Sequence, residues 1–158
     1  MKAVFKVMLA AVSAALCLAS CGFDAGKMEG DWTISTVNGR TPEDFAAYSG
    51  VGEWCVAKNY KIDGKTLTIS AMNEKGDIVS QDYAITERSG GIDASAAGVT
   101  LGLYYNEDDN SIKYSIKYGD TQYTYILKRG TVDISGMLEA GSAGQTEEKK
   151  QENDSPEI

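Results

Sequence analysis

A strict alternation of apolar and polar residues between Ser111 and Tyr118 limits the folds open to this chain. Ile112, Tyr114 and Ile116 alternate there with serines and lysines. Successive side chains of a β-strand point to opposite faces, so this segment has one apolar face and one solvated face. The pattern predicts a half-buried strand of an antiparallel sheet.

Short β segments separated by turn residues are predicted through the rest of the body, from Gly30 to Arg129. After a first strand that opens at Gly30, the predicted strands are 54–62, 65–72, 78–87, 99–105, 111–118 and 122–129. Asp63-Gly64 favours a type I′ hairpin between the first two of these segments. Residues 89–98 are rich in Gly, Ala and Ser, and they predict either a loop or a weak edge strand.

One segment, Thr41–Tyr48, has the pattern of a short helix. Thr41 suits the N-cap, Pro42 suits the first helical position, and two acidic residues follow where the helix dipole favours them. Phe45 and Tyr48 are three residues apart, so we expect them to share one face and pack against the body.

Strands joined mostly to their sequence neighbours leave exposed edges unless the sheet closes, and closure into a barrel removes those edges. The predicted fold is all-β: a small antiparallel up-and-down barrel of about eight strands, with one short helix between strands 1 and 2. Side chains either fill the interior of such a barrel or leave room for one small ligand.

The first twenty residues have the order of an export signal. Lys2 and Lys6 precede an apolar run, Val7–Leu18, that is short for a membrane span. The run ends in Leu18-Ala19-Ser20-Cys21, which resembles the lipobox of bacterial lipoproteins. The resemblance implies cleavage before Cys21 and attachment of acyl chains to its thiol.

A lipobox implies a lipid-anchored protein of the cell envelope, with its acyl chains in a membrane. Gly22 rather than an aspartate follows the cysteine, which in the enteric sorting pattern favours the outer over the inner membrane. The expected organisation is a signal peptide at 1–20, a lipidated tether at 21–29, a barrel domain at 30–135 and a disordered acidic tail at 136–158.

Two features at the ends of the body resemble the lipocalin, or calycin-like, family. Gly30-Asp31-Trp32 opens the first strand, and Lys128-Arg129 ends the last. The resemblance implies that Trp32 closes the barrel floor and that Arg129 packs across it in a cation–π contact. It also places the helix at the barrel mouth, as a mobile lid or as a plug, of which we favour the plug. Because the body is shorter than a typical lipocalin, we expect a partly filled barrel.

Composition argues against several kinds of chemistry. The sequence has no histidine, which removes the commonest general base and metal ligand. Its net charge of −8 becomes −10 once Lys2 and Lys6 leave with the leader, because the leader contains no acidic residue. That charge disfavours nucleic-acid binding. The acidic run 106–110 predicts a solvated turn rather than a calcium loop, and we expect no catalytic residue, metal or cofactor.

Tyrosines are the candidate ligand-contacting residues. Their rings offer apolar area and their hydroxyl groups can orient a ligand, although core and cross-strand packing is their commoner role. The candidates are Tyr83, Tyr105, Tyr114, Tyr118, Tyr123 and Tyr125. Cys55, the one cysteine of the body, is expected to be a small buried residue.

Three functions remain open for a membrane-anchored, non-enzymatic lipoprotein of this kind. The first is a barrel that binds a small apolar ligand or a protein partner of the envelope or host. The second is a protease inhibitor, because some small bacterial barrels insert an N-terminal segment into a protease cleft. The third is a structural or surface-antigen role without a ligand. The oligomeric state is open in all three.

Overall fold

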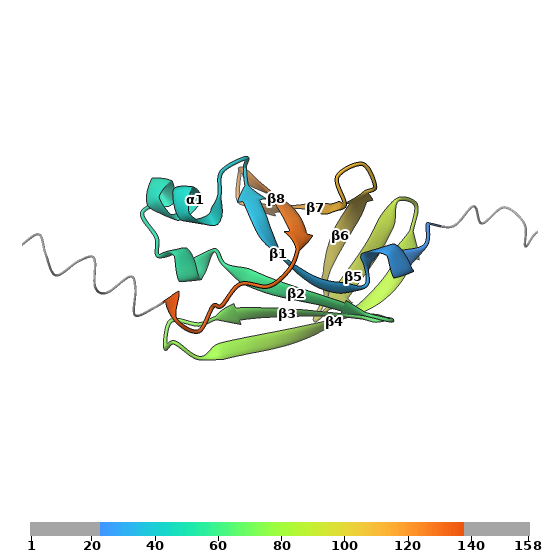
Figure 1. Ribbon diagram of the computed structural model, residues 1–158, viewed down its shortest axis with the longest axis horizontal. Helices are drawn as coiled ribbons and strands as arrows, with labels where there is room; N and C mark the ends of the chain where they lie inside the picture. The colour runs from blue at the N-terminus through green and yellow to red at the C-terminus, as the bar shows by residue number, and fades with distance from the viewer. Residues whose placement is uncertain (1–22, 138–158) are drawn as a thin grey trace, which may run out of the picture.

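The structure is a computed structural model that describes residues 23–137. The expected signal peptide, the lipobox residues and Cys21 lie outside the described residues, as does the expected tail from residue 138 onward. Eight strands form a closed barrel (Figure 1). They are β1 (Gly30–Val37), β2 (Lys58–Asp63), β3 (Thr66–Met72), β4 (Ile78–Arg88), β5 (Gly91–Ala96), β6 (Val99–Asn106), β7 (Ser111–Tyr118) and β8 (Thr121–Arg129).

Each strand pairs antiparallel with its neighbour in the sequence, and β8 returns to β1 to close the barrel. The helix α1 (Pro42–Ser49) lies between β1 and β2, and it is followed by the 3-10 turn η2 (Glu53–Cys55). The prediction of an all-β, eight-stranded up-and-down barrel with one short helix between strands 1 and 2 is therefore confirmed.

The β2–β3 hairpin is present, but its turn and its first strand differ from the prediction. Asp63 pairs with Thr66, so the turn residues are Gly64 and Lys65. Gly64 has a φ of 56° and Lys65 has no positive φ, which excludes type I′ and fits type II′. The strand begins at Lys58 rather than at residue 54, because residues 53–55 form the 3-10 turn η2 and Val56 still has a helical backbone conformation.

The glycine- and serine-rich segment 89–98 contains a full strand of the barrel wall. β5 pairs with both β4 and β6, so it is not an edge strand. Ile92 and Ala94 are fully buried. Its inner face contains one large apolar residue, Ile92, and the small Ala94, which is why composition did not distinguish a loop from a strand here.

The α1 helix begins as predicted, but one aromatic residue points the other way. The Thr41 hydroxyl accepts a hydrogen bond from the Asp44 amide at 3.2 Å, and Pro42 occupies the first turn. Phe45 packs on the barrel, 6.1 Å from the Tyr123 ring centroid. Tyr48 is instead 74% exposed, because the buried face of the helix runs through Ala46.

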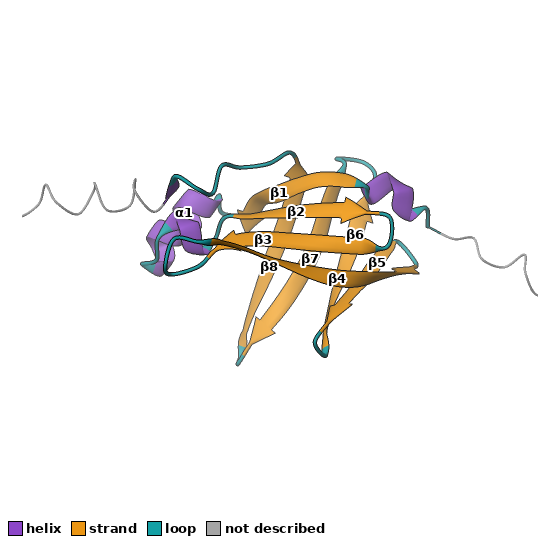
Figure 2. Cartoon of the chain, turned by 90° about the horizontal axis from the view of Figure 1, so that it is seen from below, coloured by secondary structure: helices purple, strands orange, loops and turns teal. Residues whose placement is uncertain are grey.

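The expected tether is folded onto the barrel from residue 23 onward. The 3-10 turn η1 (Ala25–Met28) lies at the end of the barrel opposite α1 (Figures 1 and 2). Met28 is fully buried and Phe23 packs against the core. Within the described residues this segment is therefore part of the domain rather than a free linker.

The chain continues along β2 after the last strand. The Asn59 side chain donates through Nδ2 to the Val132 carbonyl at 2.8 Å and accepts through Oδ1 from the Val132 backbone amide at 2.9 Å. Ile134 is buried. Among the described residues, no helix has the length and apolar character needed to cross a bilayer.

Candidate functional site

One end of the barrel is closed around Trp32. The indole is fully buried, and its Nε1 donates to the Met28 carbonyl at 2.7 Å. The Arg129 guanidinium lies 4.0 Å from the ring centroid, and it also donates to the carbonyls of Lys27 and Glu29. The cation–π contact that the lipocalin resemblance implies is present, and Arg129 also holds η1 in place.

Tyr105 belongs to this closed end, and it lines neither of the two cavities found at the opposite end. Its ring lies edge-on to Trp32 at 6.4 Å and 6.0 Å from Phe23, and its hydroxyl donates to Asn110. The proposal of Tyr105 as a cavity residue is thus not supported. The apolar–polar alternation correctly predicted that Tyr105 faces the interior of the barrel. It does not show whether a residue lies at the closed or the open end, because that depends on its position along the strand.

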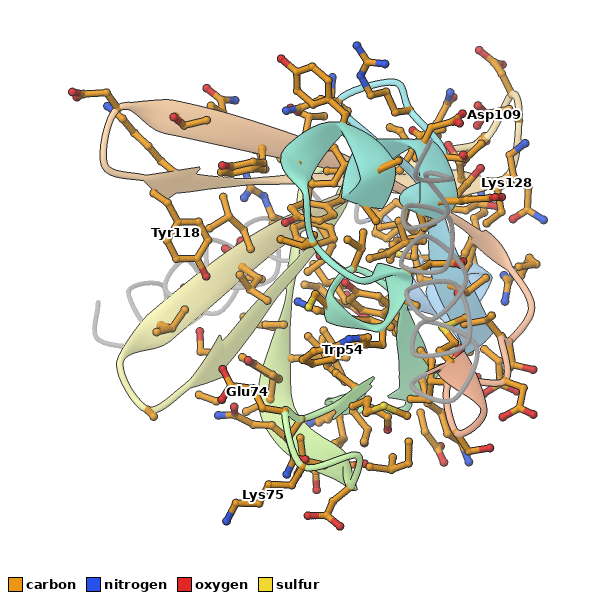
Figure 3. The ribbon with its side chains drawn as sticks, turned by 90° about the vertical axis from the view of Figure 1, so that its left-hand side faces the viewer. Trp54, Glu74, Lys75, Asp109, Tyr118 and Lys128 are labelled. Atoms are coloured by element: carbon orange, nitrogen blue, oxygen red, sulfur yellow. The ribbon has the colours of Figure 1, made fainter. Side chains whose placement is uncertain are left out.

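The opposite end is opened by a parting of the wall between β6 and β7. These strands pair only from Tyr104–Lys113 to Asn106–Ser111, so the first half of β6 and the second half of β7 do not contact each other through backbone hydrogen bonds. The β5–β6 and β7–β8 hairpins diverge there (Figure 2). Tyr118 projects from the β7–β8 hairpin at the rim (Figure 3).

The parted strands border a cavity of about 480 Å³, within the range typical of small-molecule sites. Its walls are mainly tyrosine rings and aliphatic side chains from β2, β3, β4, β6 and β7. They are Tyr60, Tyr83, Tyr114, Tyr118, Ile69, Ala71, Val79, Val99, Leu101 and Ile116, with Lys58, Ser80 and Gln81 as the other polar lining.

A second cavity, of about 320 Å³, lies beside α1. It shares Lys58 and Tyr118 with the larger cavity, and Phe45 and Ser49 of the helix form part of its wall. The helix thus packs on the barrel, as the plug interpretation expects, and leaves open space beside it. The remaining lining residues are Val51, Cys55, Val56, Tyr123 and Tyr125.

Three tyrosines, Tyr60, Tyr114 and Tyr125, form a contiguous cluster that contributes to the walls of both cavities. The Tyr114 and Tyr125 rings are parallel at 4.7 Å, and the Tyr114 and Tyr60 hydroxyls share a hydrogen bond of 2.5 Å. Burial raises the pKa of both Tyr60 and Tyr114 well above the ordinary value. These hydroxyls therefore stay protonated and keep this part of the wall neutral.

Five of the six candidate tyrosines line one of these two cavities, and Tyr105 lines neither of them. Sequence reasoning missed Tyr60, which is 1% exposed, and Lys58, which lines both cavities. The signal was available in 58–62, where Lys58, Tyr60 and Ile62 occupy alternate positions and share a face. The predicted strand began at residue 54, and residues 54–57 show no regular alternation. The alternation in 58–62 was therefore not recognised.

Cys55 is exposed, contrary to the expected burial. It is the last residue of the short η2 turn, in which no residue is buried, and it lines the smaller cavity. Within residues 23–137, no three His, Cys, Asp or Glu side chains are grouped so that they could hold a metal ion. The acidic run forms the β6–β7 turn, in which the Asn106 side chain accepts from the Asp108 amide.

The buried tyrosine pair should make the protein unstable in alkali. Because the folded pKa values lie above the unfolded value of 10.0, this stabilisation is complete below about pH 10 and is lost as the pH rises toward the folded values. We expect the free energy of unfolding to fall by about 1.4 kcal/mol per pH unit for each suppressed ionisation. Urea unfolding between neutral and strongly alkaline pH measures the slope.

The double variant Tyr60→Phe, Tyr114→Phe provides the control, since it should lose this slope. Tyrosinate absorbance of the folded protein should show Tyr60 and Tyr114 ionising only well above pH 10, because burial raises the pKa of both. Ionisation of all tyrosines in one step near pH 10 would contradict the assignment.

Comparison with protein-family models gives no match, and comparison with curated proteins gives no significant match. The site is therefore defined by its geometry: a sealed end around Trp32 and an open end with two adjoining cavities.

Proposed function

We propose that this chain is a non-enzymatic, lipid-anchored protein of the cell envelope whose barrel binds a small, largely apolar ligand. The observation that carries the binding role is the pair of adjoining cavities, about 480 and 320 Å³, at the open end. Their walls combine apolar area with a few hydroxyl groups and one amine, the composition typical of small-molecule sites.

The proposed localisation to the cell envelope rests on the sequence alone. Cys21, after Leu18-Ala19-Ser20, is the proposed lipidation site. Its acyl chains are the proposed contact with a membrane, and we favour the outer over the inner membrane. The absence of histidine from the whole sequence supports a binding role over hydrolytic chemistry that depends on that residue.

The geometry favours ligand binding over the protease-inhibitor alternative. That alternative needs a free segment ahead of the barrel, whereas residues 23–29 pack beneath it through Met28 and the two hydrogen bonds from Arg129. Unfilled space beside a core lowers the stability of the fold. A purely structural role does not account for that loss, whereas a bound ligand would fill the space.

Filling the larger cavity should remove binding. Ala71 lines the cavity from β3, so Ala71→Trp would occupy the space that a ligand needs. We expect binding of the apolar fluorophore N-phenylnaphthylamine to weaken about tenfold or more, a loss of about 1.4 kcal/mol or more in binding free energy, because the indole would exclude the ligand. Native mass spectrometry of detergent-extracted wild-type protein should also retain a lipid-like species.

Ala84→Trp is the matched control, because Ala84 lies on β4 and is exposed. It should bind the fluorophore like the wild type. Val79→Trp, at the rim of the same cavity and 48% exposed in the wild type, provides a second block that disturbs the core less. Wild-type binding by both cavity variants, with thermal unfolding showing them folded, would overturn the proposal.

A further inference from the structure

Lys58 is a charged side chain among the largely apolar residues that line the two cavities at the open end. Tyr60 and Ile62 of the same strand are buried, and Lys61 and Asp63, which alternate with them, are exposed. The period of two therefore places Lys58 on the inner face with Tyr60. It lines both cavities, and among all their lining residues it alone carries a formal charge at neutral pH.

The Lys58 ammonium group has no counter-charge in the described part of the chain. The salt bridges found within residues 23–137 are Lys27–Glu107 and Arg88–Asp93. Burial lowers the pKa of Lys58, and no carboxylate offsets that effect. A partly buried, unpaired cation is energetically unfavourable, and an anion placed beside it would remove much of that cost.

The backbone around Lys58 is held on two sides. Its carbonyl accepts a hydrogen bond from the Thr33 hydroxyl at 3.0 Å, and the neighbouring Asn59 side chain is bonded twice to Val132. Its cross-strand partner is Ala71, a small residue that also lines the larger cavity. The lysine therefore starts from a fixed position and faces open space, which is the arrangement a binding residue needs.

We propose that Lys58 binds the carboxylate head group of a single-chain amphiphile whose apolar chain lies along the tyrosine- and aliphatic-lined cavities. The inference rests on the proposed ligand-binding function and names its ligand class. A carboxylate fits because it supplies the missing negative charge and accepts hydrogen bonds from an ammonium group. Ser80, Gln81 and the Tyr118 hydroxyl offer further polar groups along the same lining.

The charge of the ligand can be tested separately from its apolar part. The probes are dansylaminoundecanoate and its methyl ester, which share the chain and the fluorophore and differ in the negative charge. The full-length chain, delipidated in a neutral glycoside detergent, should bind the acid about tenfold more tightly than the ester, as one charge-assisted contact would give. Fluorescence titration measures both affinities.

Three variants locate the preference. Lys58→Met keeps the side-chain length and should bind acid and ester equally, with ester affinity as in the wild type. Lys58→Arg should keep the preference for the acid. Lys61→Met is the matched control, because it removes a lysine from the exposed face of the same strand, and it should behave as the wild type.

Each result separates the two proposals. Equal binding of acid and ester by the wild type, or a retained preference in Lys58→Met, would overturn the role of Lys58 and leave the apolar cavity function standing. Absence of binding of both probes to the wild type would overturn both. A loss of acid preference confined to Lys58→Met supports both.

Discussion

Replacing Trp32 with alanine should lower the free energy of unfolding by about 3–5 kcal/mol, the usual cost of removing a large buried aromatic side chain. Trp32 is fully buried, and its Nε1 hydrogen bond to Met28 and its stacking with Arg129 join β1, β8 and η1. The substitution opens a cavity at the sealed end and leaves the Met28 carbonyl without this partner. Urea unfolding at neutral pH measures the loss.

Tyr48→Ala is the control for this measurement. Tyr48 is another large aromatic residue in contact with an arginine, since the Arg40 guanidinium lies 4.5 Å from its ring centroid, but it is 74% exposed. Its removal should cost less than about 1 kcal/mol. A similarly small loss for Trp32→Ala would mean that Trp32 does not close the barrel.

Replacing Cys21 with serine should abolish palmitate labelling of the protein and leave an uncleaved precursor. The serine hydroxyl cannot take the place of the thiol in the thioether bond to diacylglycerol, and processing of a lipoprotein leader follows lipid transfer. Metabolic labelling with an alkyne palmitate analogue, followed by intact-mass analysis, measures both effects. The loss of label should be complete.

The other two cysteines provide the controls. Cys17 lies in the apolar run of the proposed leader, and Cys55 is exposed within the described domain. Cys17→Ser and Cys55→Ser should each retain the label and the normal mature mass. Normal processing of the Cys21→Ser protein would refute lipid attachment at Cys21, and with it the proposed envelope anchor.

Most of the fold could be predicted because its signals are local. The alternation in 111–118 reports which side chains face inward, and the structure buries Ile112 and Tyr114 there. The Thr41 cap was readable for the same reason, since it depends on four successive residues. The start of β2 and the strand in 89–98 were less clear, because few residues carry the pattern in either segment.

The site was predictable only in part. The sequence identified five tyrosines that line the cavities, because alternation selects the inner face of each strand. It did not separate Tyr105, which packs on Trp32 at the closed end, from Tyr114, which borders a cavity at the open end. Both lie on inner faces, and they differ only in how far along the barrel axis their strands carry them.

The order of apolar and polar residues was enough to determine a meander of short strands, their inner faces and the helix after the first strand, because each depends on backbone geometry over a few residues. The tertiary structure alone decided where the barrel is sealed and where it is open. β6 and β7 pair over only three positions, and that separation depends on the stagger of all eight strands around the barrel. The same stagger brings Lys58 to the junction of two cavities.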